Sequence, residues 1–264
     1  VLNILEIFEK YNIHATWATV GFLFFNSKEE LFCSLPDKKP SYVNNSLSPY
    51  NFLKLNDLNK QGNSIYFAKN LIDKILCSDN QEIGSHTFSH YYCLENGQNI
   101  EEFTSDMLAA KNIGKKFNLN IESLVFPRNQ INTNYLSVCS ELNINSYRGN
   151  QLSFLYKNGS SNDSLLKRAF RLIDTYINIS GHNVYTPSNE SNKFPLNIRA
   201  SSFLRPYSKK LRYIDYFKLR RIRRAMTYAA KMGGTYHLWW HPHNFGINLE
   251  KNIAFLAKVL DHYL

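Results

Sequence analysis

The chain has 264 residues, of which 44% are hydrophobic and 14% aromatic, and its formal net charge is +10 at pH 7. A chain of this length and apolar content can bury one large core, which excludes a disordered protein. No apolar run approaches the roughly 20 consecutive residues that a membrane-spanning helix needs, and the opening "VLNILEIFEKYN" has no secretory-signal layout.

The four cysteines are widely spaced and form no Cys-x-x-Cys pair. They are Cys33, Cys77, Cys93 and Cys139. This spacing favours reduced, mostly buried thiols over a disulfide framework or a zinc knuckle. We therefore expect a cytoplasmic protein, or one that is peripheral to the inner face of the membrane.

Apolar periodicity alternates between helical and strand-like segments along the chain. The expected helices cover residues 2–11, 65–77, 101–117, 132–142, 213–231 and 249–263. The expected strands cover residues 15–20, 82–85, 123–126, 144–147, 198–203 and 235–240. This alternation predicts an α/β fold with a parallel sheet inside and helices outside. Because the pattern resumes after the two longest loops, residues 34–64 and 174–195, we expect a single domain over residues 1–264.

Two histidines four residues apart follow the second predicted strand, in "QEIGSHTFSH" (residues 81–90). If a helix begins after Ser85, His86 and His90 lie on one face of it, where two neutral imidazoles can bind one transition-metal ion. The alternative is a pair of histidines at a helix start, bonded to carbonyls or water. In "LVFPRNQIN" (residues 124–132), Arg128 also follows a strand, and from there a guanidinium can orient a catalytic carboxylate.

A strongly basic stretch runs from Lys209 to Lys231, with nine Lys or Arg residues and one Asp. It predicts a helix that keeps its cations in water and turns an apolar stripe to the core. The stripe consists of Leu211, Ile214, Phe217, Leu219, Ile222 and Met226. The alternative is a surface for peripheral contact with an anionic membrane or an acidic glycan. No nucleic-acid partner is expected, since no zinc-finger, RRM or KH-type motif accompanies the charge.

The last predicted strand ends at another histidine, His241, in "YHLWWHPHNFG" (residues 236–246). Trp239 and Trp240 suit stacking on a sugar ring or packing in a core, and alternation along a strand sends one of the two to the core. We expect His243, two residues farther on, to face away from His241.

Together these motifs resemble those of the polysaccharide deacetylases, the NodB-homology domains of carbohydrate esterase family 4. The family's metal motif, His-Ser/Thr-x-x-His, is matched by His86, Thr87 and His90. Its closing Leu-x-x-His motif is matched by Leu238 and His241. The resemblance covers nearly the whole chain and implies a distorted (β/α)7 barrel, similar to a TIM barrel.

The sequence departs from the family pattern in three places. Pro127 precedes Arg128, whereas the family's arginine motif reads Arg-Pro, and "SYRGN" (residues 146–150) stands where the family has an Asp motif. "YNIHATWATVG" (residues 11–21) is similar to the segment after the family's first motif, Thr-Phe-Asp-Asp, which is not in this sequence. We therefore expect the chain to begin inside the domain, without the first strand and its two aspartates, and this fragment to be inactive.

The resemblance implies a metal-dependent hydrolase that removes N-acetyl or O-acetyl groups from sugar units of a cell-surface polysaccharide or its lipid-linked precursor. His86 and His90 would bind a divalent metal, in the first place Zn²⁺, with Co²⁺, Ni²⁺ or Mn²⁺ as alternatives. His241 would be the general acid, and Arg128 would orient the catalytic carboxylate. The expected substrate-binding residues are Thr87, Pro127, Tyr147, Leu238, Trp239 and Trp240.

Two other functions stay open at this point. One is hydrolysis of a non-peptide C–N bond in a small molecule, as in ureide-processing relatives of the fold. The other is a catalytically inactive module that binds a glycan. A shared fold does not separate these functions, because function depends on the site that the fold carries.

Overall fold

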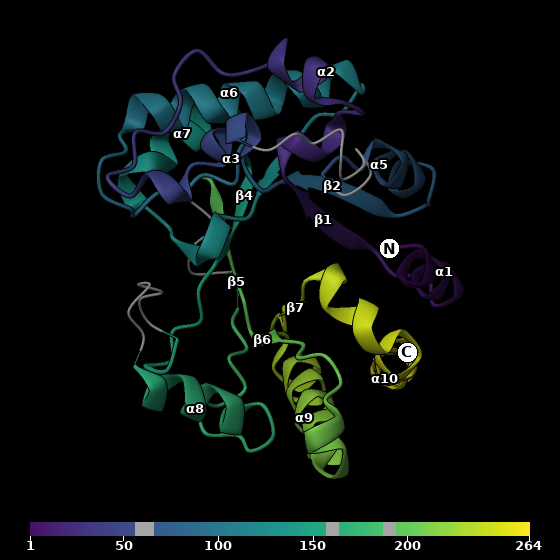
Figure 1. Ribbon diagram of the computed structural model, residues 1–264. Coiled ribbons are helices and arrows are strands. Elements are labelled where there is room, and N and C mark those ends of the chain that lie inside the picture. The colour runs from purple at the N-terminus through teal and green to yellow at the C-terminus, as the bar shows by residue number, and fades with distance from the viewer. Residues whose placement is uncertain (56–65, 157–163, 187–193) are drawn as a thin grey trace. The chain divides into compact units, whose positions relative to one another are not determined.

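The computed structural model describes residues 1–55, 66–156, 164–186 and 194–264 (Figure 1). The chain forms two compact units. Unit 1 comprises Val1–Ile13, Gly149–Ser191 and Ile198–Leu264. Unit 2 comprises His14–Arg148 and Asn192–Asn197. The single domain expected over residues 1–264 stays a prediction.

Unit 2 alternates strands and helices. Its strands are β1 (Ala15–Thr19), β2 (Gln81–Ser85), β3 (Ser123–Leu124) and β4 (Ser146–Gly149), and β4 and β5 (Leu196–Arg199) continue into unit 1. Its helices are α2 (Lys28–Phe32), α3 (Pro49–Leu55), α5 (Lys69–Leu76), α6 (Ile100–Lys116) and α7 (Leu136–Glu141). The helix expected over residues 65–77 begins at Ile65, which lies outside the described residues, and appears as α5 in the described part.

Strands β1 to β5 form one parallel sheet in the order β1-β2-β3-β4-β5. β1 pairs with β2 from Ala15 opposite Gln81 onward, and β3 lies in parallel between β2 and β4. β5 joins β4, and the N–H of Ala200, just past β5, donates to the carbonyl of Gly149, the last residue of β4, at 2.8 Å. The predicted α/β fold with a parallel sheet is therefore confirmed. Because the strands are parallel, their carboxyl ends lie at the same edge of the sheet.

In its described residues, unit 1 holds a smaller sheet and four α-helices. Its elements are α1 (Leu2–Lys10), α8 (Leu165–Asp174), β6 (Ser202–Phe203), α9 (Asp215–Met232), β7 (Leu238–Trp239) and α10 (Leu249–Tyr263). β6 and β7 pair in parallel. The single strand predicted over residues 198–203 is two strands, because the N–H groups of Ser201 and Ser202 both donate to the carbonyl of His237, at 2.9 and 3.2 Å. The first half of the segment pairs with β4 and the second half with β7.

Three helices in the described residues lie where loops were predicted: α2, α3 and α8, with five, seven and ten residues. Ser27 caps α2 by accepting a hydrogen bond from the N–H of Glu30 at 3.3 Å. Ser164 caps α8 in the same way, accepting from the N–H of Lys167 at 3.2 Å. Helices this short fall below the window of 11 or more residues in which helical periodicity is readable.

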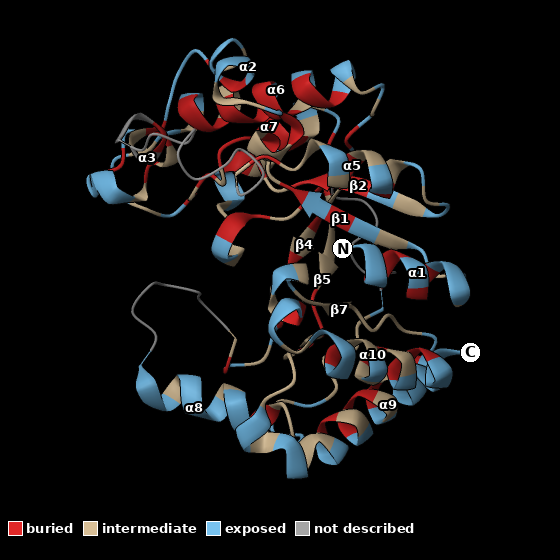
Figure 2. Ribbon diagram, turned by 45° about the vertical axis from the view of Figure 1, so that its right-hand side comes forward, coloured by how far each residue is buried: buried red, intermediate tan, exposed pale blue. Residues whose placement is uncertain are grey.

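The core of unit 2 lies between the sheet and helices α6 and α7, which Figure 2 shows as mostly buried on their inner faces. The ring of Phe103, fully buried, stacks on Tyr135 with centroids 5.0 Å apart. Cys93 and Cys139 are buried in this core, whereas Cys33 and Cys77 are exposed, and all four thiols are free. The expectation of mostly buried thiols therefore holds for two of the four.

Helix α9 does not keep all of its cations in water. Its buried positions are Lys218, Arg221, Ile222, Ala225 and Ala229. Lys218 pairs with Asp215 at 3.0 Å and lies over the Phe255 ring at 4.2 Å. In the predicted apolar stripe, Ile222 is 3% exposed but Phe217 is 47% exposed. The prediction of an apolar stripe is thus confirmed for Ile222 and wrong for Phe217. Lys218 and Arg221 occupy buried positions of α9, because carboxylates and an aromatic ring pair with them.

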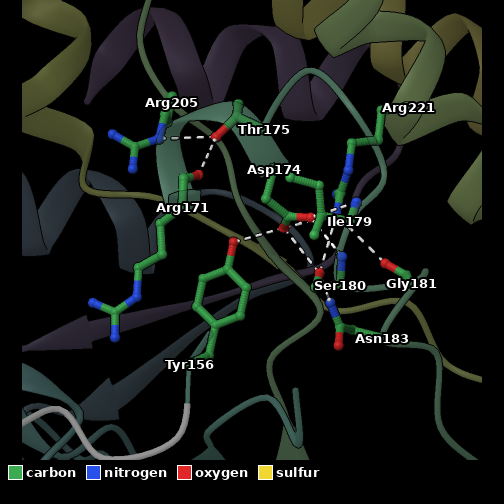
Figure 3. A network of polar contacts seen from close by, with 10 residues as sticks. All are labelled: Tyr156, Arg171, Asp174, Thr175, Ile179, Ser180, Gly181, Asn183, Arg205 and Arg221. Atoms are coloured by element: carbon green, nitrogen blue, oxygen red, sulfur yellow. Dashed lines mark hydrogen bonds and ion pairs between the residues drawn. The ribbon is translucent and has the colours of Figure 1, made fainter. Parts of the chain in front are cut away.

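Asp174, the last residue of α8, joins α8 to α9 through a buried network (Figure 3). Its carboxylate, 1% exposed, accepts hydrogen bonds from the N–H groups of Ile179 and Ser180 at 2.9 and 2.7 Å. It also accepts from the hydroxyls of Tyr156 and Ser180, both at 2.9 Å. Arg221 Nη2 lies 2.9 Å from the same carboxylate. A buried carboxylate with this many donors fixes the position of every segment that it touches.

We expect Asp174→Ala to destabilise unit 1 by about 3–5 kcal/mol, because removing one partner of a buried ion pair leaves the Arg221 charge uncompensated. Urea unfolding followed by circular dichroism measures the loss. The matched control is Asp261→Ala, which removes an exposed carboxylate of the same unit that binds only the Tyr11 hydroxyl among the described contacts. A loss for Asp174→Ala no larger than that of the control would contradict the role of the network.

Candidate metal and catalytic site

The segment after β2 is a loop and not the helix predicted after Ser85. Thr87 and His90 have φ values of +62° and +60°. This left-handed region is rarely adopted by a β-branched residue such as threonine. The N–H of Thr87 donates to Ser85 Oγ at 2.9 Å, and the N–H of Tyr91 donates to Thr87 Oγ1 at 2.7 Å. The argument from a shared helix face is therefore wrong, because two left-handed residues in the segment interrupt any helix.

A buried carboxylate on α6, Asp106, holds this loop. It is fully buried and accepts hydrogen bonds from the N–H groups of Phe88 and Ser89 at 2.7 and 3.1 Å, and from the Ser89 hydroxyl. Burial raises the pKa of Asp106 to about 6, although the bonds from Ser89 and Phe88 act in the opposite direction. Sequence reasoning missed Asp106. The available signal was a carboxylate one turn from Phe103 and beside Met107, in the apolar stripe of a helix.

The loop brings the rings of His86 and His90 together, with centroids 4.8 Å apart and planes at 71°. His86 Nδ1 lies 2.6 Å from the carbonyl oxygen of Val125. Because a carbonyl only accepts, this bond places the proton on Nδ1 and the lone pair on Nε2, the nitrogen that can bind a metal. His90 Nδ1 lies 3.2 Å from the Tyr92 hydroxyl. The two rings converge as the spacing predicts, and their role as metal ligands stays a prediction.

Arg128 reaches the same cluster through Tyr92. Its guanidinium lies over the Tyr92 ring at 4.1 Å from the centroid, and Nη1 lies 3.6 Å from Glu95 Oε1. Glu95 also accepts a hydrogen bond from Gln130 Nε2 at 2.8 Å. Arg128 itself has φ of +53°. Five side chains therefore form a connected series at the carboxyl ends of β2 and β3, each in contact with the next. In order, they are His86, His90, Tyr92, Arg128 and Glu95.

Arg148, in the segment "SYRGN" that sequence analysis left without a role, supports the Arg128 loop. Its Nη2 donates to Asn129 Oδ1 at 2.7 Å, and Asn129 is left-handed with φ of +54°. Burial lowers the pKa of Arg148 to about 10, so the guanidinium keeps its charge at neutral pH. The signal that could have found it is a charged residue near the carboxyl end of a buried strand.

Three residues expected to bind substrate are buried in unit 2. Thr87 is 0% exposed, Tyr147 is 8% exposed, and Pro127 is also buried. Thr87 holds the loop after β2, and the Tyr147 ring packs against Phe126 with centroids 5.9 Å apart. These side chains therefore shape the loops and the core, and their burial gives no support to a direct contact with substrate.

His241 belongs to unit 1, where it precedes the 3₁₀ turn Pro242–Asn248 and is exposed. Its ring lies 5.5 Å from that of Trp239 and 5.3 Å from that of His243, with the two imidazoles stacked at 18°. The expectation that His243 faces away is wrong. The stacked rings lie on the same side, because the chain enters the 3₁₀ turn after His241; an extended strand would also have put residues two apart on one face.

The two tryptophans have different surroundings, as strand alternation predicts. Trp240 packs in unit 1, stacked on Phe245 at 5.7 Å and edge-on to Phe8 at 6.1 Å. Trp239, in contrast, lies beside His241, with ring centroids 5.5 Å apart. Leu238, the other residue of β7, is of intermediate exposure. Trp239 is therefore the better candidate of the two for contact with a sugar ring.

Among the described residues, no group of three or more His, Cys, Asp or Glu side chains is placed to hold a metal ion. If they bind a metal, His86 and His90 would supply two of the three protein ligands that a catalytic zinc site usually has. The pair fits a transition metal in donor type, because the contact with Val125 leaves the lone pair of His86 on Nε2, and it has one donor fewer than such a site.

In comparisons with known proteins, no family model and no curated protein matches the chain. Within the described ranges, no helix is long and apolar enough to cross a membrane.

The raised pKa of Asp106 predicts a pH-dependent difference in stability between the wild type and Asp106→Asn. The folded state holds the Asp106 proton more tightly than the unfolded chain does. Its contribution to stability is therefore fully present below the unfolded pKa, near 3.9, and is lost as the pH rises through about 6. Between pH 7.5 and pH 5, the wild type should gain about 1 kcal/mol relative to Asp106→Asn. Urea unfolding at the two pH values measures this, and a constant or opposite difference would contradict it.

Proposed function

We propose that this protein is a metal-dependent hydrolase that removes N-acetyl groups from sugar units of a cell-surface polysaccharide or its lipid-linked precursor. The observation that carries the proposal is the convergence of His86 and His90 at the carboxyl end of β2, with centroids 4.8 Å apart. Catalytic groups of parallel α/β folds gather at this end of the strands. The Val125 carbonyl fixes the His86 tautomer, as outer partners do for histidine ligands.

The strand order supports the barrel part of the proposal. In an open doubly wound sheet the order reverses near its middle, whereas in a (β/α) barrel each strand lies beside the next one in the chain. The order β1-β2-β3-β4-β5 has no reversal. β6 and β7 are also parallel and are joined by a helix, α9. A distorted (β/α)7 barrel of the deacetylase type accommodates both observations.

The chemistry of amide hydrolysis gives each residue a task. A divalent metal bound by His86 and His90 would polarise the substrate carbonyl and lower the pKa of a water molecule. Arg128, fixed between Tyr92 and Glu95, is the group that orients a carboxylate. The leaving amine needs a proton, and the exposed His241 of unit 1 is the candidate donor that the family resemblance implies.

We expect this protein to bind one Zn²⁺ more weakly than three-ligand sites do, because two imidazoles are the ligands that the described residues offer at this place. His86→Ala and His90→Ala should each lower the affinity at least about 100-fold, the upper end of the loss for partners that only orient a ligand. Isothermal titration measures the affinity. The matched control is His14→Ala, an exposed histidine of the same unit, which should bind Zn²⁺ as the wild type does. Equal affinities for all four proteins would exclude the pair as the metal site.

Acetate release from an N-acetylglucosamine oligomer tests the reaction itself. We expect none from the Zn²⁺-loaded chain alone, and release once formate is added, because a small carboxylate can accept the proton of the attacking water. His90→Ala should abolish the formate-dependent release, and His14→Ala should retain it. Oligomer binding without release under any condition would favour the glycan-binding module, and hydrolysis of a ureide would favour the small-molecule hydrolase.

A further inference from the structure

A pocket of about 740 Å³ opens in unit 1 beside α9. Its walls come from α9, from residues 176–182 after α8, and from His262 of α10. Five cationic side chains line it: Arg220, Arg221, Arg223, Arg224 and Lys231. The described lining residues include no Asp or Glu. The pocket therefore concentrates positive charge in a concave surface, where the field of several cations adds up.

This charge has little internal compensation. Of the five cations, Arg221 is the one with a carboxylate partner in the described part of the chain, Asp174 at 2.9 Å (Figure 3). The surrounding charge also acts on His182, another lining residue, whose pKa is lowered by burial and by the nearby Arg221 and Arg224. A ligand that neutralises the pocket must therefore carry more than one negative charge or be present in several copies.

The pocket also has buried donors that no described group accepts. Nε of Arg221 and Nε of Arg223 are buried N–H donors without a hydrogen-bond partner in the described residues, and Nδ1 of His182 is a buried ring nitrogen without one. The Arg221 side chain is 6% exposed and lines the pocket. Buried donors without acceptors are costly, and anionic oxygens entering the pocket would satisfy them. The planar guanidinium fork matches the geometry of a phosphate group.

An exposed apolar surface adjoins this pocket. Figure 2 shows α8 exposed along most of its length. Four of its large apolar residues, Leu165, Leu166, Phe170 and Ile173, are 80%, 72%, 48% and 43% exposed. Their spacing places them on one side of the helix, with Lys167, Arg168 and Arg171 on the other. Ile177, 63% exposed, continues the apolar residues beyond α8 and itself lines the pocket.

We propose that unit 1 docks on an anionic phospholipid bilayer, with lipid phosphates in the α9 pocket and the apolar side of α8 among the headgroups. A cationic pocket with exposed apolar residues at its edge has the two parts of a peripheral membrane contact, charge attraction and apolar insertion. Asp174 ties the two parts together, since it ends α8 and pairs with Arg221 of α9. A soluble phosphate compound would use the cations but leave α8 without a role.

Co-sedimentation with phosphatidylcholine vesicles, with or without phosphatidylglycerol, tests the proposal. The wild type should bind the anionic vesicles and not the neutral ones. Arg220→Ala with Arg224→Ala removes two exposed lining cations and should weaken binding about 30-fold, the factor for two cations at about 1 kcal/mol each. Lys209→Ala with Lys210→Ala removes two exposed cations of the same basic stretch outside the pocket and should change binding little. Leu165→Ser with Phe170→Ser should also weaken binding.

Two results would overturn the proposal. Equal losses for the two charge variants would show that net charge, and not the pocket, attracts the vesicles. Tight binding of inorganic pyrophosphate together with no binding to anionic vesicles would assign the pocket to a soluble phosphate ligand. Thermal unfolding of each variant checks that it is folded. All of the replaced residues are exposed, so their replacement leaves the Asp174 network intact.

Discussion

The hydrogen bonds from Phe88 and Ser89 to the buried carboxylate of Asp106 are the interaction on which the candidate site depends. They fix the middle of the loop after β2, so that the histidines on either side meet with ring centroids 4.8 Å apart. Without a helix to set their spacing, the two imidazoles are positioned by Asp106 together with the Thr87 bond to Tyr91 and the Val125 carbonyl that contacts His86. The arrangement is costly, because a fully buried carboxylate is held without a cationic partner among the described residues.

Backbone strain marks the same region. Thr87, His90, Arg128 and Asn129 all adopt left-handed conformations, in the loops that follow β2 and β3. Such residues cost on the order of 1–3 kcal/mol each unless, like Asn, they tolerate the region, and they persist where surrounding bonds over-determine them. Here those bonds include Tyr91 N–H to Thr87 Oγ1 and Arg148 to Asn129. Strained backbone at the ends of strands is typical of functional sites. The loops after β2 and β3 are therefore the part of unit 2 where we place the candidate site.

Unit 1 uses a buried carboxylate for a different purpose. Asp174 and Asp215 neutralise Arg221 and Lys218, the two cations on the inner side of α9. The remaining cations of the helix have no such partners among the described residues and line an open pocket. The same basic sequence is thus divided in two by the fold: one part stabilises unit 1, and the other is available to an anionic surface.

Elements whose signal is local could be predicted from the amino-acid sequence alone. Apolar periodicity predicted α10 with its observed bounds, Leu249–Tyr263, the α/β class, and histidines at strand ends. Three features come from contacts between distant parts of the chain: the left-handed loop at Thr87, the support from Asp106 and Arg148, and the division of residues 198–203 between two sheets. These features depend on hydrogen bonds between distant residues, such as Phe88 to Asp106 and His86 to Val125. Periodicity within a window of one element carries no information about such partners, so His86, His90 and Arg128 were predictable as candidates, whereas Asp106, Tyr92 and the geometry were not.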